Sequence, residues 1–360
     1  MRPPESLRLP DIILIFLIIL CPLHIFSQER KVVPDISAQS YNFIPLASGQ
    51  NTSIRGMSVV SDKIAWVSGS NGNIGRTEDA GITWQWTKPA GYEQLDFRDI
   101  EAFDERRAII VNAGSPAYVL LTQDGGKSWH ECYKNTDSAI FLDGMNFWDG
   151  QTGLIFGDPI HDKMRLLKTR DGGLNWQDIS DNMRTPLSVG EAGFAASGTG
   201  IRTLGRGKAW IATGGAVSNI YFTNNYGYTW KSFKCPIIQG ESSTGVFSLD
   251  FYDKNHGVVV GGNYLKDKES NNNVLITTDG GKTWKIPSRP VSGYRSGVVY
   301  ITAKLLVATG SSGTDISTDG GMNWHNLSSL SFNVVQKSKN GKLILLGGNK
   351  GEIYRMQITK

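Results

Sequence analysis

Six copies of a tryptophan-terminated motif are spread along this 360-residue chain, and they restrict its fold more than any other feature. Each copy reads Ser/Thr-x-Asp-x-Gly-x-Thr/Ser/Asn-Trp, except that Asn replaces Asp in the fourth. The copies end at Trp84, Trp129, Trp176, Trp230, Trp284 and Trp324. Successive copies are roughly 40 to 54 residues apart, which is the length of a four-stranded propeller blade. The chain is therefore expected to repeat one supersecondary unit around a ring.

The chemistry of the motif indicates a tight turn rather than a catalytic centre. Asp and Asn side chains accept hydrogen bonds from backbone N–H groups of their own turn, and glycine supplies the positive φ that closes it. The tryptophan begins the next strand and carries a large apolar surface. We therefore predict that each copy joins the last two strands of a blade. The predicted structural residues are Asp79, Trp84, Asp124, Trp129, Asp171, Trp176, Asn225, Trp230, Asp279, Trp284, Asp319 and Trp324.

A second pattern gives the number of blades. Before each turn an apolar strand runs toward a glycine, and a seventh such strand near the C-terminus has no turn of its own. These strands end at Gly69, Gly114, Gly157, Gly214, Gly261, Gly310 and Gly347. Residues 40–47 precede the first repeat and can supply the strand missing from the last blade, which leaves no open sheet edge there. The predicted fold is all-β: a seven-bladed β-propeller of four-stranded blades, closed by an N-terminal strand that joins the C-terminal blade.

The first residues have the features of an export signal. A short start with Arg2 and Arg8 precedes an apolar run at residues 12–26, whose uninterrupted part is too short for a membrane span. We expect a cleaved signal and an exported protein, periplasmic or extracellular. A retained anchor and a lipoprotein modified at Cys21 are the alternatives. The predicted segments are a signal peptide at residues 1–27, a linker at 28–38 and the propeller at 39–360.

Charge and composition exclude several classes of partner. The chain carries a formal net charge of +4, and residues 1–27 contain equal numbers of acidic and basic side chains, so signal removal leaves this balance unchanged. No run of Lys and Arg marks a nucleic-acid surface. The stretch GSNGNIG at residues 69–75 belongs to a hairpin and not to a strand-to-helix turn, so we expect no dinucleotide. Cys132 and Cys235 lie in different repeats and are expected to be separate thiols.

We expect no metal ion or other cofactor. The histidines His130, His161, His256 and His325 are scattered and lack the spacing of a zinc site. The Asp-Gly-Gly turns look superficially like calcium loops, but they lack oxygen ligands at alternating positions. We also expect no stable membrane span once the signal is removed, and we expect a monomer.

The repeated turn resembles the Asp-box of bacterial sialidases and of several other propellers. The run GNIGRTEDAGITW at residues 72–84 is similar to the pattern GxIxRTxDxGxTW of the photosystem II stability and assembly factor family and its non-photosynthetic bacterial relatives. The resemblance extends over the repeats of essentially the whole mature chain, and it implies a propeller fold. In photosynthetic members the family implies an assembly factor that binds a partner protein.

The ends of the innermost strands are the expected location of a site, because propellers usually bind ligands at one end of the central channel. Aligning the seven predicted inner strands places one residue of each at this end, although a one-residue error in register would turn a side chain to the other face. The aligned residues are Arg55, Arg98, Asp143, Glu191, Phe247, Arg295 and Asn333. Arg55, Arg98 and Arg295 are thus predicted to form an arc, with Asp143 and Glu191 opposite them.

Two blades depart from the repeated template. Blade 3 contains FGDPIHDKMR, in which Asp158 and Pro159 stand where other blades have ordinary turn residues. Blade 4 contains VGEAGFAASGTGIR at residues 189–202, which is unusually rich in small residues. Small residues allow a ligand or another backbone to come close, and insertions into a repeat tend to lie on the binding face.

Three functions compete for this end of the protein. The first is a binding or assembly scaffold for a protein or peptide, in which the arginine arc contacts carboxylates. The second is a glycoside hydrolase acting on an extracellular polysaccharide, with an acid and a base drawn from Asp143, Glu191 and Asp158, since both glycosidase mechanisms need a carboxyl pair. The third is a sialidase, in which three arginines hold the substrate carboxylate and a Tyr paired with a Glu is the nucleophile.

The scaffold is the function that the sequence favours, so the protein is not expected to be an enzyme. The segment before the first box reads PLASGQNTSIRG and lacks the Arg-Ile-Pro start that sialidases carry there. The only nearby candidate for a tyrosine nucleophile, Tyr294, is merely adjacent to Arg295. Xyloglucanases also use Asp-box propellers, but usually two joined ones, and this chain has room for one.

Overall fold

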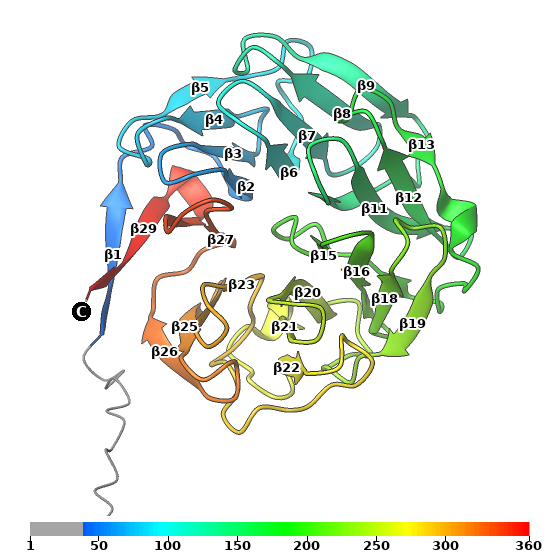
Figure 1. Ribbon diagram of the computed structural model, residues 1–360, viewed down its shortest axis with the longest axis vertical. Coiled ribbons are helices and arrows are strands. Elements are labelled where there is room, and N and C mark those ends of the chain that lie inside the picture. The colour runs from blue at the N-terminus through cyan, green and yellow to red at the C-terminus, as the bar shows by residue number, and fades with distance from the viewer. Residues whose placement is uncertain (1–38, 360) are drawn as a thin grey trace, which may run out of the picture. The chain divides into compact units, whose positions relative to one another are not determined.

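The computed structural model describes residues 39–359, which form a ring of seven antiparallel sheets (Figure 1). The predicted signal peptide, residues 1–27, and the predicted linker, residues 28–38, lie outside the described residues. The ring confirms the predicted all-β, seven-bladed propeller. Within the described part of the chain, no helix has the length and hydrophobicity that crossing a bilayer requires.

Blades 1 to 3 follow the four-stranded plan, with strands in chain order from the centre of the ring outward. Blade 1 contains β2 (Ile54–Val59), β3 (Ala65–Gly69), β4 (Ile74–Thr77) and β5 (Gln85–Thr87). Blade 2 contains β6 (Phe97–Ala102), β7 (Ala108–Asn112), β8 (Ala117–Thr122) and β9 (His130–Asn135). Blade 3 contains β10 (Leu142–Phe147), β11 (Gly153–Ile160), β12 (Lys163–Thr169) and β13 (Gln177–Asp178), followed by the short helix η2 (Ser180–Asn182).

Blades 4 to 6 keep the plan with local additions. Blade 4 contains β15 (Ile201–Leu204), β16 (Lys208–Ala212), β18 (Asn219–Thr223) and β19 (Lys231–Lys234). Blade 5 contains β20 (Thr244–Phe251), β21 (Gly257–Asn263), the short helix η3 (Tyr264–Lys266), β22 (Val274–Thr277) and an outer bridge from Ile276 to Lys285. Blade 6 contains β23 (Gly297–Tyr300), β24 (Leu306–Gly310), β25 (Gly313–Ser317) and β26 (Trp324–Ser328). The short strands β14 (Glu191–Ala192) and β17 (Gly214–Gly215) pair with each other, and β17 also pairs with β20.

Blade 7 closes the ring with strands from both ends of the chain. It contains β27 (Val334–Lys337), β28 (Ile344–Gly347), the short helix η4 (Asn349–Gly351), β29 (Ile353–Thr359) and β1 (Ser40–Leu46). The pairing of β1 with β29 runs from Ser40 opposite Thr359 to Leu46 opposite Ile353. Figure 1 shows β1, in blue, beside β29, in red. The predicted closure by an N-terminal strand is confirmed.

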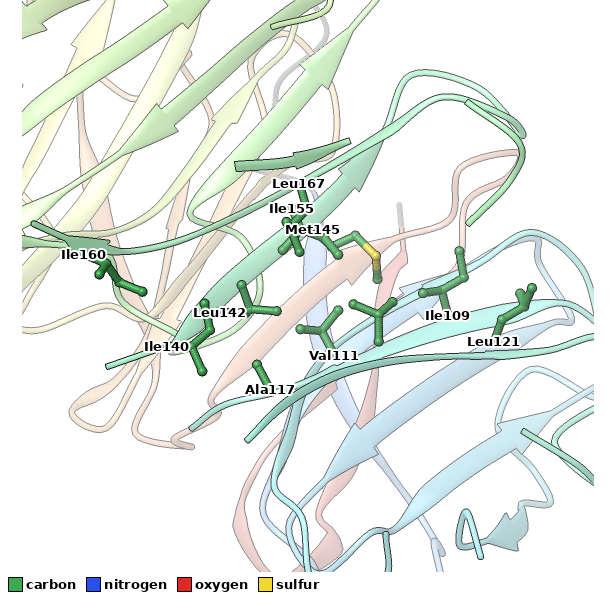
Figure 2. Close-up of a cluster of buried hydrophobic side chains, with 11 residues drawn as sticks. Ile109, Val111, Ala117, Leu121, Ile140, Leu142, Met145, Ile155, Ile160 and Leu167 are labelled. Carbon is green, nitrogen blue, oxygen red and sulfur yellow. The ribbon is translucent and has the colours of Figure 1, made fainter. Parts of the chain in front are cut away.

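The hydrophobic core is divided among the interfaces between neighbouring blades. Figure 2 shows one interface, where Ile109 and Val111 of blade 2 meet Leu142, Met145 and Ile155 of blade 3. Each blade is covered by a neighbour on both faces, so its middle strands are apolar on both sides. This explains why the strands that gave the blade count read as continuous apolar runs rather than as alternating patterns.

The innermost strands present backbone N–H groups that no further strand can pair with. Side chains of the preceding blades accept hydrogen bonds from these N–H groups. The Asp99 carboxylate of β6 accepts the N–H of Met145 in β10 at 2.6 Å, and the Asp250 carboxylate of β20 accepts that of Tyr300 in β23 at 2.8 Å. These contacts satisfy the open inner edges and join one blade to the next.

The Asp-box turns have the predicted position between the last two strands and the predicted hydrogen bonds. In blade 2, the Asp124 carboxylate accepts the N–H of Ser128 at 3.0 Å and its hydroxyl at 2.6 Å. The N–H of Gly126 donates to the Thr122 hydroxyl at 2.9 Å, and Gly126 has a φ of 85°. The Ser128 hydroxyl and the backbone N–H groups of the turn hold the pKa of Asp124 well below its usual range.

The same turns hold neighbouring blades together, which the sequence pattern did not predict. Gly126 packs against Trp66 of blade 1, and Gly173 packs against Ile109 of blade 2. Trp129 is half-buried against the cluster between blades 1 and 2. Among the six motif tryptophans only Trp324 is fully buried, so the rings cover interfaces between blades rather than filling the centres of the blades.

Cys132 and Cys235 are both free, in agreement with the prediction of separate thiols. Burial raises the pKa of Cys132 to about 11 and that of Cys235 to about 12. Within residues 39–359, no three His, Cys, Asp or Glu side chains are grouped in a way that could hold a metal ion.

Candidate functional site

A β-bulge at the start of the inner strand recurs at the same register in four blades. The extra residue lies between Ile54 and Gly56 in β2, and equivalent shifts in register occur in β6, β10 and β20. A bulge leaves one residue unpaired and re-aims its side chain. The bulge residues are Arg55, Arg98, Asp143 and Phe247.

In blades 1, 3 and 5, a glycine of the second strand leaves room for the inner strand at this point. A Cβ on Gly157 would collide with the carbonyl oxygen of Phe141, and a Cβ on Gly261 would collide with that of Gly245. The two backbones therefore pass too close for any larger residue. Gly69, Gly157 and Gly261, which helped to reveal the number of blades, are thus part of the geometry that positions Arg55, Asp143 and Phe247, whereas blade 2 has Asn112 at this position.

The bulge residues line one cavity of about 550 Å³ where the inner strands begin. This volume lies in the range of ordinary ligand pockets. Of the seven residues that the sequence alignment placed together, the cavity is lined by Arg55, Arg98, Asp143, Phe247 and Asn333. Further lining residues include Asp158, Phe194, Tyr264, Tyr294, Ser296 and Asn349.

Arg295 does not line this cavity, and its alignment with the other six residues was wrong. Ser296 lines the cavity instead, and Arg295 stands one residue earlier, where its side chain points into blade 6. It is fully buried, with a guanidinium nitrogen 2.6 Å from the Asp315 carboxylate. The corresponding inward position in other blades is apolar and is occupied by Ile54, Phe97, Leu142 and Val246.

A signal for this one-residue error is present in the sequence. Asp315 lies in β25 at the position that Leu120 occupies in β8 and Leu275 in β22. A buried carboxylate needs a cation or several donors nearby, because an isolated charge is very costly in the interior. An acidic residue at an apolar strand position therefore predicts a buried partner, and Arg295 is that partner.

Glu191 was also misplaced by the alignment. The innermost strand of blade 4 is β15, which begins at Ile201, so Glu191 belongs to an insert before it. Its buried carboxylate accepts hydrogen bonds from four donors, and it does not line the cavity. The donors are Ser188 N–H, Thr213 Oγ1, Asn219 Nδ2 and Tyr221 Oη, at 2.6 to 3.0 Å. Glu191 therefore fastens the insert to blade 4.

We call residues 188–200 the blade-4 insert. The carbonyl of Ala196 accepts a hydrogen bond from Arg55 of blade 1 at 3.1 Å, and the hydroxyl of Ser197 donates to the carbonyl of Ser296, next to blade 6, at 2.6 Å. Blade 1 lies across the ring from blade 4, so the insert reaches over the channel. Because the sequence indicated only that small residues gather here, this crossing could not be foreseen.

Other contacts of the insert fix the floor of the cavity. The N–H of Gly193 donates to the Asp158 carboxylate of blade 3 at 2.9 Å. The ring of Phe194 stacks on Phe247 of blade 5 with centroids 3.9 Å apart. Because a Cβ on Gly193 would collide with the Asp143 carboxyl, only glycine lets the insert pass this close.

Arg55 and Arg98 form a pair of neighbouring cations on one side of the cavity. Arg98 forms an ion pair with Asp96 at 2.7 Å and donates to the carbonyl of Ala195 at 3.4 Å. Arg55 donates only to the insert carbonyl. Burial, together with the positive charge of Arg98, lowers the pKa of Arg55.

Asp143 and Asp158 form a carboxyl pair beside these arginines. Asp143 is 2% exposed, and Asp158 is half-buried at a second bulge, in β11. The Asp158 carboxyl and the N–H of Ala195 lie against the carboxyl of Asp143, and both Asp143 oxygens are shut off from solvent. Burial and the nearby Asp158 carboxyl raise the pKa of Asp143, and burial raises that of Asp158.

Aromatic side chains form a further part of the cavity lining. Phe247 packs edge-on against Tyr294 at 4.8 Å between centroids and against Tyr264 at 6.0 Å. Tyr264 lies in η3 and is 47% exposed, so it forms the rim. In the sequence Tyr294 stands out only as the neighbour of Arg295, whereas in the structure Tyr294 lines the cavity and Arg295 does not. Tyr264 had no sequence signal, because it lies in a loop outside the repeat.

The opposite end of the inner strands holds a second cavity of about 500 Å³. Lys339 contacts Glu101 here, Arg202 lies 3.0 Å from the Asp250 carboxylate, and Asp149 accepts backbone N–H groups of its own turn. Arg55, which has no ion pair, and the contacting carboxyl groups of Asp143 and Asp158 therefore distinguish the first cavity. It can receive an anionic group at the arginines, a cationic group at the carboxyls and an apolar group at the aromatic wall.

Comparison with known proteins agrees with the repeat and the fold. A sequence model of the family described as "Photosynthesis system II assembly factor YCF48" matches residues 94–235, and one of the BNR/Asp-box repeat matches residues 275–285. The chain is an Asp-box propeller similar to YCF48. Curated proteins include one relative, vacuolar protein sorting/targeting protein 10 of Colletotrichum graminicola, which is 32% identical over 136 residues. That match covers 32% of this chain and spans only 9% of the relative's length.

Solved structures share the fold of this Asp-box propeller at low sequence identity. YCF48 bound to a D1 peptide superposes with a TM-score of 0.62 at 17% identity, covering 88% of this chain and 94% of that one. YCF48 from Cyanidioschyzon merolae gives 0.62 at 15% identity, covering 88% and 98%. A GH74 xyloglucanase from Xanthomonas campestris gives 0.57 at 16% identity, covering 88% and 53%. These likenesses establish the architecture of the propeller alone.

Proposed function

We propose that this chain is a binding or assembly scaffold that holds a segment of a partner protein in the cavity at the start of the inner strands. Arg55 and Arg98 contact a carboxylate of the partner, because neighbouring guanidinium groups suit bidentate contact with a carboxylate. The protein acts in a periplasm or outside the cell, since residues 1–27 have the features of an export signal.

Arg55 carries this proposal. Its half-buried side chain lines the cavity, and no carboxylate of residues 39–359 lies within ion-pair distance of it. A partly buried cation without a counterion is unfavourable, and an anionic group on a ligand removes that cost.

The similarity to YCF48 supports a protein partner. One of the similar structures is described as YCF48 bound to a D1 peptide, so a propeller of this architecture holds a peptide. The partner of this chain is a separate question, because the two sequences are 17% identical.

Site-specific photo-crosslinking in the source cells tests the proposal. A crosslinking amino acid replaces Asn349, which lines the cavity, or Asn340, which lines the opposite one. We expect Asn349 alone to capture a partner protein, and Arg55→Gln to abolish the adduct. Arg184→Gln, at an exposed arginine outside both cavities, serves as the matched control. Capture that survives Arg55→Gln, or equal capture from both positions, contradicts the proposal.

The glycoside hydrolase alternative has less support from the geometry. Glycosidases separate their two carboxyl groups by about 5 to 9.5 Å. Asp143 and Asp158 are in hydrogen-bonding contact, and the carboxylate of Glu191 is occupied by four donors outside the cavity. A polysaccharide screen in which Asp158→Asn abolishes cleavage would revive this alternative.

A further inference from the structure

The connection between β21 and β22 in blade 5 is longer than the equivalent connections of the other blades. It spans residues 264–273, whereas residues 70–73 connect β3 to β4 in blade 1 and residues 311–312 connect β24 to β25 in blade 6. We call residues 264–273 the blade-5 loop. Insertions into a repeat tend to lie on the binding face. This loop does reach the cavity, as the blade-4 insert does, because its first residue, Tyr264, lines it.

The blade-5 loop holds two large apolar side chains in contact with solvent. Tyr264 is 47% exposed and Leu265 is 72% exposed. The Asn263 side chain accepts the N–H of Leu265 at 3.0 Å, and the hydroxyl of Ser311 donates to the Asp267 carboxylate at 2.8 Å. The loop is thus fastened on both sides of these two residues. A rigid surface of this kind loses little conformational entropy when a ligand binds to it.

Tyr294 connects this surface with the arginine side of the cavity. The rings of Tyr264 and Tyr294 pack edge-on with centroids 6.4 Å apart. Burial raises the pKa of the Tyr294 hydroxyl, and the positive charge of the neighbouring Arg55 counteracts that rise. An anionic group at Arg55 and an apolar group at the blade-5 loop therefore lie within reach of one short peptide segment.

We propose that the partner segment combines an acidic side chain, which contacts Arg55, with a large apolar side chain, aromatic or leucine, which packs on Tyr264 and Leu265. This inference rests on the proposed function and adds the second feature that the partner must have. Burial of a large apolar side chain contributes more to affinity than an ion pair at the rim of a site, which mainly sets orientation. Tyrosine is also among the residues that most often dominate the affinity of protein interfaces.

Binding of an array of synthetic peptides to the full chain tests the inference. Each peptide of eight residues is acetylated and amidated, so that its termini carry no charge. It has Glu at the fourth position, Phe at one of the other positions and Ser elsewhere. Reference peptides have Ser in place of Phe, or Gln in place of Glu. Fluorescence anisotropy near neutral pH should show at least one Glu–Phe peptide binding about tenfold more tightly than both of its references.

Variants assign the preference for Phe to the blade-5 loop. Leu265→Ser and Tyr264→Ala should each reduce this preference about fivefold, while the peptide with Glu alone keeps its affinity within about twofold. Ile82→Ser and Ile286→Ser are the matched controls, because these side chains are 66% and 64% exposed and line neither cavity. Thermal unfolding of each variant verifies that it is folded.

The outcomes separate this inference from the proposed function. If Glu peptides bind through Arg55 but no Phe position raises the affinity more than about twofold, the inference is overturned and the scaffold stands. Equal losses in Leu265→Ser and Ile286→Ser overturn the assignment to the blade-5 loop. An array without any binding peptide also overturns the inference, whereas the scaffold is then decided by partner capture from Asn349. If Arg55→Gln changes neither peptide binding nor partner capture, both are overturned.

Discussion

At the scale of single residues, the cavity is defined by side chains that break the rules of a propeller core. Arg295 and Asp315 obey those rules, because each buried charge has the other as its partner. Asp143 does not, since it is buried against a second carboxyl group, that of Asp158, and forms no ion pair. Natural proteins commonly accept such a loss of stability at sites that serve a function.

Asp143→Asn should therefore increase the free energy of unfolding by about 1–3 kcal/mol near neutral pH, because the amide can donate to the Asp158 carboxylate where two ionised carboxyl groups would repel each other. The raised pKa of Asp143 means that the folded protein holds this proton more tightly than the unfolded chain. Wild-type stability should consequently fall as pH rises from the ordinary carboxyl range, near pH 4, toward the raised value. The Asn side chain does not titrate, so its advantage should grow with pH. Urea unfolding of both proteins across this pH range measures the difference in their free energies of unfolding. An Asn variant less stable than the wild type would contradict the prediction.

At the scale of elements, the Asp-box turn and the blade-4 insert have different origins. The turn is specified locally, because Thr122, Asp124 and Ser128 hydrogen-bond within eight residues of sequence. The insert is specified by distant contacts, with blade 1 through Arg55 and with blade 5 through Phe247. The first kind of element can be predicted from sequence and the second cannot.

The packing of the turn on the neighbouring blade predicts the effect of removing its ring. Trp129→Ala should lower the free energy of unfolding by about 2–3 kcal/mol, less than the usual cost for a fully buried tryptophan because the ring is half-buried. Denaturant unfolding measures the loss, and peptide affinity should be unchanged because Trp129 does not line the cavity. Lys127→Ala, at an exposed position in the same turn, is the control and should change stability by less than about 0.5 kcal/mol. An unchanged free energy of unfolding for Trp129→Ala would refute the packing role.

At the scale of the whole molecule, closure of the ring depends on seven residue pairs between β1 and β29. Without β1, the strand β29 presents a free edge, and partly buried side chains such as Phe43, which packs near Phe332, are lost. Open edges of this kind promote association between chains.

A chain that begins at residue 47 should therefore be less stable than one that begins at residue 39. We expect a lower midpoint of thermal unfolding and soluble aggregates in size-exclusion chromatography, because β29 becomes an unpaired edge. Addition of a synthetic peptide of residues 39–47 should restore part of the stability. Equal midpoints for the two chains would mean that β1 contributes nothing to closure.

The architecture could be predicted from the sequence alone, because the information for it is local and repeated. Asp-boxes, strand-ending glycines and the unpaired seventh strand each depend on contacts within one repeat or on a simple count of strands. The same periodicity correctly aligned Arg55, Arg98, Asp143, Phe247 and Asn333 at one end of the ring, where the bulge recurs.

Only the tertiary structure decided the composition of the cavity. A one-residue shift placed Arg295 inside blade 6 and Ser296 on the cavity, since side chains on a strand alternate between faces. The blade-4 insert replaced the expected inner strand, so Glu191 became an anchor while Phe194 reached Phe247. Repeats fix the local backbone, but the partner of a buried charge and the path of a loop across the channel depend on contacts between residues far apart in the sequence.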